Sequence, residues 1–215
     1  MAYTLVIATK EWSSWSLRPY LALRAVGAPF AEVVIQLRRD TTAAEVRKHS
    51  PSGRVPLLKI EEAGQTWNVW DSLAICETLA ERHADAGLWP DDARTRAEAR
   101  AVSAEMHSGF PDVRDQLGMD FARKLPLPDL RAATKEQVAR ILKIWTDALA
   151  AHGGPFLFGR FSIADCMYAP VCSRFRTYGV EMPGAAQAYV ERMFALPAMV
   201  DWGRCAQREV DEGLA

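Results

Sequence analysis

The sequence predicts a small α/β domain at its start, followed by a larger domain that is entirely helical. Strand and helix signals alternate over residues 1–83, whereas the periodic segments that follow a connection at residues 84–90 all have helical spacing. A chain of 215 residues is long enough for two domains that each bury a core. We therefore expect one domain at residues 1–83 and a second at residues 91–215.

The first domain is expected to contain its elements in the order β-α-β-α-β-β-α. Short β-prone runs predict its strands, at residues 3–8, 30–37, 55–60 and 66–70. A helix with one apolar face is predicted at residues 16–26, and a short helix at residues 42–49. Because proline is tolerated only in the first turn of a helix, Pro19 predicts that the first helix has Ser16 as its N-cap.

The second domain is expected to contain only helices. A long, charged and alanine-rich helix is predicted at residues 91–117, with a bend at Pro111. Apolar residues at helical spacing predict the remaining helices, at residues 133–152, 162–178, 184–195 and 198–209. Ser162 and Asp165 have the spacing of a capping box at a helix start, and we interpret this pair as structural.

The composition excludes several classes of function. The formal net charge is −1 and no basic block occurs, so neither nucleic acid nor an anionic membrane is an expected partner. No apolar run is long enough to cross a bilayer, and the first residues lack the pattern of a signal peptide, so we expect a cytoplasmic protein. The four cysteines form no CxxC pair and the four histidines are dispersed, so we expect reduced thiols and no metal site.

Three motifs follow one another along the chain. The first is Ser13-Ser14-Trp15-Ser16-Leu17-Arg18, the second is Ser52-Gly53-Arg54-Val55-Pro56-Leu57 followed by Asp71-Ser72, and the third is Phe161-Ser162-Ile163-Ala164-Asp165. With these motifs, almost the whole chain resembles the cytosolic glutathione S-transferases, and in particular their serine-type, zeta-like bacterial branch. The resemblance implies a thioredoxin-like N-terminal domain, an all-α C-terminal domain, glutathione as cosubstrate and a homodimer.

The resemblance also implies that a serine at the start of the first helix stabilises the glutathione thiolate. A free thiol with a pKa of about 8.5 is mostly protonated at neutral pH, and a hydroxyl donor beside the sulfur favours the thiolate. Ser13 matches this position, with Ser14 as the alternative. A purely structural interpretation is that the serines cap the helix, and we accept that interpretation for Ser16.

The second motif is expected to bind glutathione. Val55-Pro56 matches the cis-proline turn of the family, which presents the Val55 backbone to the cysteinyl amide of glutathione. Asp71 is expected to bind the γ-glutamyl ammonium and Ser72 the γ-glutamyl carboxylate, and both are also good N-cap residues for a helix. Arg54 matches a position that contacts glutathione, although a solvated surface arginine is an equal interpretation.

The resemblance implies an electrophile pocket between the first helix and the long helix of the second domain. Its candidate residues are Trp15, His107 and Arg174. Packing is an alternative role for Trp15, and an ordinary helix histidine is the alternative for His107. Trp15 stands where the family motif has a small cysteine, which argues against a straightforward maleylacetoacetate isomerase.

These residues predict an enzyme that conjugates glutathione to a small electrophile, or isomerises one, as in detoxification. A glutathione-dependent disulfide reductase is disfavoured, because the start of the first helix carries no cysteine. The alternative from another class is a glutathione-binding scaffold without turnover, since fold alone does not establish function. Loss of the serine donor or of the Asp71-Ser72 pair would indicate the scaffold, and both are present.

Overall fold

A computed structural model describes all residues from Met1 to Ala215. The N-terminal part is built on one four-stranded sheet with the strand order β2-β1-β3-β4. The strands are β1 (Ala2–Ala8), β2 (Phe30–Ile35), β3 (Leu57–Glu62) and β4 (Gln65–Trp70). Strand β1 pairs in parallel with β2, Tyr3 lying opposite Phe30, and antiparallel with β3, which in turn pairs antiparallel with β4.

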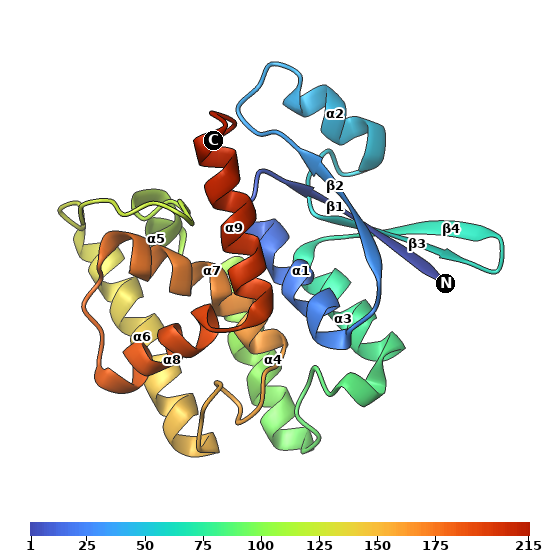
Figure 1. The fold of residues 1–215 in the computed structure, drawn as a ribbon. Coiled ribbons are helices and arrows are strands. Elements are labelled where there is room, and N and C mark those ends of the chain that lie inside the picture. Colours follow the sequence, from blue (N-terminus) through green and yellow to red (C-terminus); the bar gives the residue numbers. More distant parts are fainter.

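Three helices accompany this sheet: α1 (Ser14–Val26), α2 (Thr42–His49) and α3 (Ser72–Arg82). Helices α1 and α3 lie between the sheet and the remaining helices, whereas α2 packs beside β2 (Figure 1). Because both faces of the central strand β1 are covered, its apolar residues are buried without alternation, as Leu5, Val6 and Ile7 show. The predicted order β-α-β-α-β-β-α is confirmed.

The rest of the chain is helical. After a short 3-10 helix, η1 (Ala84–Ala86), the helices are α4 (Ala93–Ser108), α5 (Pro111–Gln116), α6 (Ala132–His152), α7 (Ile163–Tyr178), α8 (Gly184–Phe194) and α9 (Pro197–Asp211). Helix α7 is buried along nearly its whole length, between α1 on one side and α4 and α8 on others. One continuous apolar core therefore joins the sheet layer to the helical part. No helix combines the length and the apolar character that crossing a membrane requires.

The prediction of a single long helix at residues 91–117 is wrong, because the chain forms two helices there. Helix α4 ends at Ser108, and α5 begins at Pro111 after Gly109 and Phe110. Proline disfavours helical geometry at the residue before it, and Phe110 adopts a left-handed conformation with φ of 60°. The chain therefore turns at this point instead of bending within one helix.

The predicted start of the first helix is also wrong. Ser13 occupies the N-cap position of α1, and Pro19 lies inside the helix, beyond its first turn. The Ser16 hydroxyl instead accepts a hydrogen bond from the backbone N–H of Ala8 at 3.2 Å. Ser16 thus ties the first helix to the end of β1 and does not cap the helix.

Two other helix starts agree with the sequence. Asp71 caps α3, since its Oδ1 accepts hydrogen bonds from the backbone N–H groups of Leu73 at 2.9 Å and Ala74 at 3.2 Å. Ser162 and Asp165 form the predicted capping box at the start of α7. Both starts are specified by short-range hydrogen bonds, which is why local sequence patterns predict them.

The last helix holds the loop that leads into α1. The carboxylate of Glu209 accepts hydrogen bonds from the backbone N–H groups of Lys10 and Glu11, both at 2.9 Å. The indole N–H of Trp202 donates to the carbonyl of Lys10 at 2.9 Å. Helix α9 therefore fixes the backbone just before the serines of the first motif.

Candidate functional site

A cleft of about 620 Å³ lies where the edge of the N-terminal part meets α4. Its walls come from the start of α1, the turn before β3, the junction of β4 with α3 and one residue of α4. They are formed by Trp15, Ser52, Arg54, Val55, Pro56, Trp70, Asp71, Ser72 and His107. Six of the residues predicted from the sequence are therefore brought together here: Trp15, Arg54, Val55, Asp71, Ser72 and His107. A larger hollow, of about 830 Å³ between the end of α7 and α8, contains none of the predicted residues.

Asp71 lines the cleft in an unusual backbone conformation. Its φ is 76°, in the left-handed region that few residues other than glycine adopt. One carboxylate oxygen caps α3, and the other, Oδ2, lies 3.1 Å from Nε2 of His107. Backbone strain of this kind is concentrated at functional sites, and here it directs a carboxylate into the cleft.

His107 extends from α4 to this carboxylate. Burial lowers the pKa of His107 from 6.5, and the neighbouring Arg18 and Arg114 act in the same direction, against the raising effect of Asp71. The imidazole is therefore neutral at pH 7 and donates its Nε2–H to Asp71. The Trp15 ring meets the imidazole edge to face, with the ring centroids 5.3 Å apart. His107 thus links the helical part to the cleft.

The two candidate serines directly precede Trp15 at the start of α1. Ser13 and Ser14 are each 6% exposed, and neither lines the cleft directly. The Ser13 hydroxyl donates to Oγ of Ser16 at 2.7 Å, whereas the Ser14 hydroxyl makes no hydrogen bond within the chain. The backbone N–H groups of Trp15 and Ser16 also have no backbone partner, as expected in the first turn of a helix. Hydrogen-bond donors are therefore concentrated at this helix start.

The turn before β3 offers backbone groups to the cleft. The Val55–Pro56 peptide bond is cis, as the resemblance implied. The N–H and C=O groups of Val55 make no backbone hydrogen bond within the chain. Arg54, beside it, is exposed and forms no ion pair. Ser52, the first residue of the second motif, also lines the cleft, as does Trp70, which belongs to no motif. Trp70 is 48% exposed, which is unusual for so large an apolar side chain.

Arg174 does not line the cleft. It is buried, and its guanidinium donates to the carbonyl groups of Leu117 and Arg114 near the end of α5. Burial lowers the pKa of Arg174 to about 10. The side chain satisfies carbonyl groups that the end of a short helix leaves without partners.

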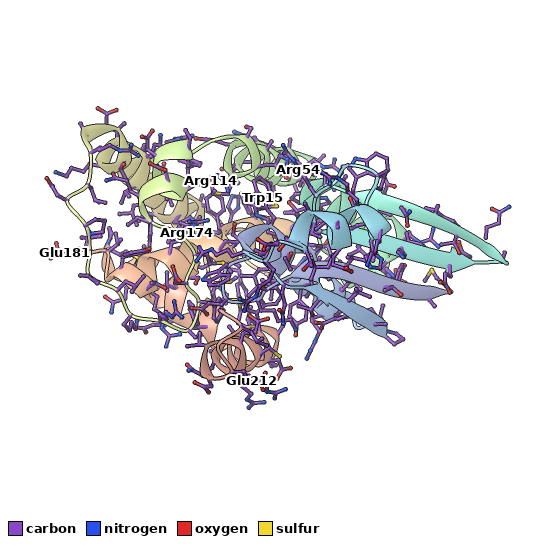
Figure 2. The ribbon with its side chains drawn as sticks, turned by 90° about the horizontal axis from the view of Figure 1, so that it is seen from above. Trp15, Arg54, Arg114, Arg174, Glu181 and Glu212 are labelled. Carbon is purple, nitrogen blue, oxygen red and sulfur yellow. The ribbon has the colours of Figure 1, made fainter.

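Two further arginines, Arg18 of the first motif and Arg114, lie next to the cleft residue Trp15. The guanidinium carbon of Arg18 lies 4.4 Å from the ring centroid of Trp15, and that of Arg114 lies 4.9 Å from it. Figure 2 shows Trp15 between Arg54 on the sheet side and Arg114 on the helical side. Arg18 is fully buried, and its Nη1 donates to Oγ of Ser72 at 3.3 Å. The sequence feature that could have indicated the burial of Arg18 is its position between apolar residues in a predicted helix.

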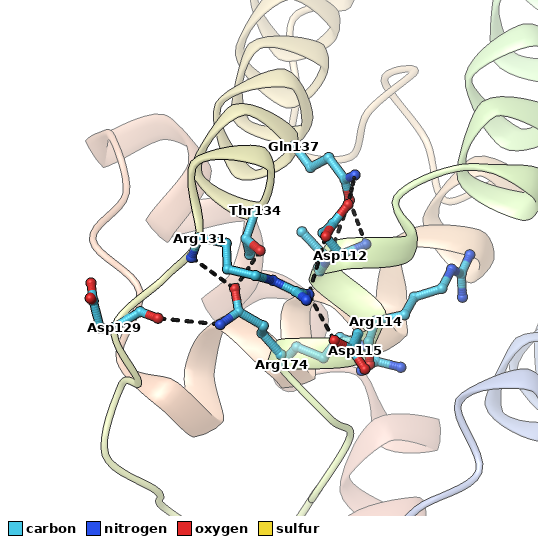
Figure 3. A network of polar contacts seen from close by, with 10 residues as sticks. Asp112, Arg114, Asp115, Asp129, Arg131, Thr134, Gln137 and Arg174 are labelled. Atoms are coloured by element: carbon cyan, nitrogen blue, oxygen red, sulfur yellow. Dashed lines mark hydrogen bonds and ion pairs between the residues drawn. The ribbon is translucent and has the colours of Figure 1, made fainter.

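Helix α5 holds Arg114 in this position. Oε1 of Gln137 accepts hydrogen bonds from two backbone N–H groups at the start of α5, at 3.0 and 3.1 Å. Oε1 of Gln116, on α5, accepts one from the backbone N–H of Arg131 at 2.9 Å. Figure 3 shows this network between α5 and α6, with the Arg114 side chain pointing away from it. The guanidinium of Arg114 itself donates to the carbonyl groups of Gly109, at 3.0 Å, and of Met106 near the end of α4, and these bonds hold it over the Trp15 ring.

The fold and the cleft together define a class of protein. A mixed four-stranded sheet with a cis-proline turn and a capped helix start at one cleft, followed by an all-helical part, is a thioredoxin-like domain joined to a helical domain. A family model described as "Glutathione S-transferase, N-terminal domain" matches residues 12–82, and one described as "Glutathione S-transferase, C-terminal domain" matches residues 128–205. The chain belongs to the glutathione S-transferase family of enzymes.

Individual relatives agree with this assignment. The chain is 27% identical over 170 residues to a probable maleylacetoacetate isomerase of Caenorhabditis elegans, covering 79% of this chain and 77% of the relative. A glutathione transferase homolog from Burkholderia, solved with bound glutathione, superimposes with a TM-score of 0.72 at 22% identity, covering 97% of this chain and 99% of that one. A maleylacetoacetate isomerase from Anaeromyxobacter dehalogenans, solved with glutathione in its active site, gives 0.66 at 24% identity, covering 94% and 95%. At these identities the two structures support the fold.

Proposed function

We propose that the protein binds glutathione in the 620 Å³ cleft and presents its thiolate to a small electrophile, which it conjugates or isomerises. One observation carries this proposal. The Asp71 carboxylate, the Ser72 hydroxyl and the unpaired backbone groups of Val55 face one cleft, and they complement an ammonium, a carboxylate and a peptide amide. The two similar structures that contain glutathione support the choice of this tripeptide.

Each end of glutathione has a partner in this arrangement. Oδ2 of Asp71 accepts a hydrogen bond from the γ-glutamyl ammonium, and Ser72 with the first turn of α3 binds the γ-glutamyl carboxylate. The Val55 backbone pairs with the cysteinyl residue in the manner of a short antiparallel strand. Arg54 has no ion-pair partner within the chain and is exposed at the cleft, so it is available to a carboxylate of the tripeptide.

The serine pair at the start of α1 stabilises the thiolate in this proposal. A hydroxyl that donates to sulfur favours the ionised form, and the unpaired N–H groups of the first turn add to this effect. Ser13 keeps the role given by the family motif, and its hydroxyl needs only to rotate away from Ser16. Ser14 is the alternative, because its hydroxyl is already without a partner.

Trp15 and His107 form the side of the cleft that faces the electrophile. Trp15 is 36% exposed and replaces a small residue of the family motif, so it narrows and flattens the space beside the sulfur. An electrophile with a planar apolar portion fits against the indole face. Arg174, which is committed to backbone carbonyl groups, has no part in this proposal.

The cellular setting in the proposal rests on the family. We place the protein in the cytoplasm as a homodimer that acts in detoxification. Sedimentation velocity tests the assembly directly, since a monomer at micromolar concentration would contradict it.

Calorimetric titration with glutathione is the experiment that tests the function. Asp71→Asn keeps an N-cap for α3 but removes the charge that binds the ammonium, so its affinity is expected to fall about 10-fold to 100-fold. Asp129→Ala, a change at a fully exposed carboxylate, is the matched control and should bind as the unmodified protein does. Full affinity in Asp71→Asn would refute the assigned site. Absence of binding by the unmodified protein would refute the function, and binding without turnover would favour the scaffold.

A further inference from the structure

Arg18 is a buried cation that has no acidic partner. Arg18 lies on α1, its side chain is fully buried, and it forms no salt bridge. Nη1 donates to the Ser72 hydroxyl, whereas Nε and Nη2 have no hydrogen-bond partner. Leaving a buried charge unpaired lowers the stability of the folded state. A residue kept at such a cost requires an explanation beyond packing.

The Arg18 side chain remains positively charged in its buried surroundings. Burial is the main reason that the pKa of Arg18 is lowered to about 9; the guanidinium groups of Arg114 and Arg174 also lower it, whereas Cys76 and the carboxylate of Asp71 raise it. The group is thus still protonated at pH 7. The Trp15 ring covers it on the cleft side, at 4.4 Å from the guanidinium carbon. A positive charge that is shielded from solvent therefore lies in contact with the Ser72 hydroxyl.

This contact determines what the Ser72 hydroxyl can do. A guanidinium has only donors, so Oγ of Ser72 must act as the acceptor in their hydrogen bond. The hydroxyl proton is then free to point away from Arg18, toward the cleft that Ser72 lines. Ser72 is also the first residue of α3, where the helix dipole is positive. All three features favour a negatively charged group at this position.

We propose that Arg18 is a positioning residue for anion binding at Ser72. It orients the Ser72 hydroxyl as an outward donor and adds positive charge behind it, so that the cleft selects a tripeptide whose γ-glutamyl group carries its α-carboxylate. This inference rests on the proposed glutathione-binding function and deepens it. It predicts that the effect of changing Arg18 depends on that one carboxylate of the bound molecule.

The test compares two probes by calorimetry. One is glutathione, and the other is γ-aminobutyryl-cysteinyl-glycine, which replaces the γ-glutamyl α-carboxylate by hydrogen. Arg18→Met is expected to lose about 10-fold to 100-fold in affinity for glutathione, the range of a hydrogen bond to a charged group, and less than about 2-fold for the analogue. Arg18→Lys, which keeps a charged donor, is expected to recover part of the loss. Arg24→Met, on the same helix but at an exposed ion pair, is the matched control and should leave both affinities unchanged.

Arg18→Gln is measured in parallel, because a polar side chain is a smaller disturbance to the fold than methionine. It keeps a donor for Ser72 without the charge, so a smaller loss for glutathione is expected, again with the analogue spared. Equal affinity of the Arg18 variants and the unmodified protein for glutathione would overturn the inference and leave the proposed function intact. An equal loss for both probes would overturn it as well, since it would indicate a general structural role. If the unmodified protein bound neither probe, the proposed function itself would fail.

Discussion

Nε2 of His107 lies 3.1 Å from Oδ2 of Asp71, so one hydrogen bond joins helix α4 to the start of helix α3. Asp71 belongs to the part of the cleft assigned to glutathione, and His107 belongs to the part assigned to the electrophile. Asp71 is held from both sides, because its other oxygen caps α3. The orientation of the carboxylate thus depends on both domains, and its effective charge depends on the protonation of His107.

Glutathione affinity is expected to decrease as the pH falls below 6.5, because His107 then becomes protonated. Burial lowers the pKa of His107 from 6.5, so the imidazole is neutral at pH 7 and gains its proton only below 6.5. An imidazolium paired with Asp71 offsets the carboxylate charge that attracts the γ-glutamyl ammonium. Calorimetry between pH 5 and 7.5 should show a loss of roughly 3-fold to 10-fold at the acidic end, equivalent to about one charged contact.

His107→Asn removes the titrating group but keeps a side-chain donor for Asp71. Its affinity should vary little over the same pH range. His152→Asn, at the distant end of α6, is the control and should retain the full pH dependence. A decrease of the same size in His107→Asn would assign the effect to another group.

Ser13→Ala is expected to leave glutathione affinity nearly unchanged but to raise the pKa of the bound thiol. The hydroxyl contributes a hydrogen bond to the charged sulfur only, so its loss penalises the thiolate and not the binding of the rest of the tripeptide. The pKa of the thiol should rise by about one to two, and turnover at neutral pH should fall roughly 10-fold to 100-fold. Thiolate absorbance as a function of pH measures the first effect. Ser14→Ala is the matched variant: if it alone shifts the titration, the role passes from Ser13 to Ser14.

The fold was largely predictable because its signals are local. Helix α2 was predicted at its observed residues, and the capping of α3 by Asp71 follows from side-chain hydrogen bonds within three residues. The break at Phe110 was missed because helical periodicity continues on both sides of it. Pro111 was interpreted as the site of a bend, but its effect falls on the residue before it, and this changes the direction of the chain.

The site was predictable where motif residues touch the cleft through short loops, as Val55, Asp71 and Ser72 do. Arg18 was not assigned, because a helical arginine is usually solvated and its burial here results from the packing of α1 against α3 and α7. The placement of Arg174 failed for a related reason. Its side chain satisfies carbonyl groups at the end of α5, and that end exists only because the long helix is broken.

Asp165→Ala is expected to destabilise the protein strongly without affecting the cleft. The buried carboxylate accepts hydrogen bonds from the Ser162 N–H at 2.8 Å, the Ser162 hydroxyl at 3.0 Å and the Leu157 N–H at 3.1 Å. Its removal leaves these buried donors unpaired, at a cost of about 2–4 kcal/mol and roughly 5–15 °C in Tm. Thermal denaturation measures the loss. Asp92→Ala, at an exposed helix cap, is the control and should lower Tm much less. A loss in Asp165→Ala no larger than the control would contradict the assignment.

Glu11→Gln is expected to stabilise the protein at neutral pH, in contrast to a change at its neighbour Glu209. Glu11 is fully buried; Oε2 accepts a hydrogen bond from the Ala122 N–H at 2.8 Å, but Oε1 has no partner. Burial raises the pKa of Glu11 above 4.5, so the native state holds this proton more tightly than the unfolded state does. The contribution of Glu11 to the free energy of unfolding is therefore greatest at acidic pH. It decreases as the pH rises through the raised pKa of Glu11 in the folded state.

Glutamine removes the buried charge while its carbonyl oxygen can still accept from Ala122. Urea denaturation should show Glu11→Gln more stable than the unmodified protein by about 1 kcal/mol at pH 7.5, with the difference vanishing or reversing near pH 4. Glu209→Gln should be destabilising at pH 7.5, because both oxygens of that carboxylate accept backbone hydrogen bonds and an amide can replace only one of them. Destabilisation by Glu11→Gln at pH 7.5 would contradict this prediction, because it would mean that the buried charge of Glu11 stabilises the folded state. Glu11→Gln and Glu209→Gln are thus expected to change the free energy of unfolding in opposite directions. The comparison distinguishes the cost of burying a charge from the benefit of pairing backbone N–H groups.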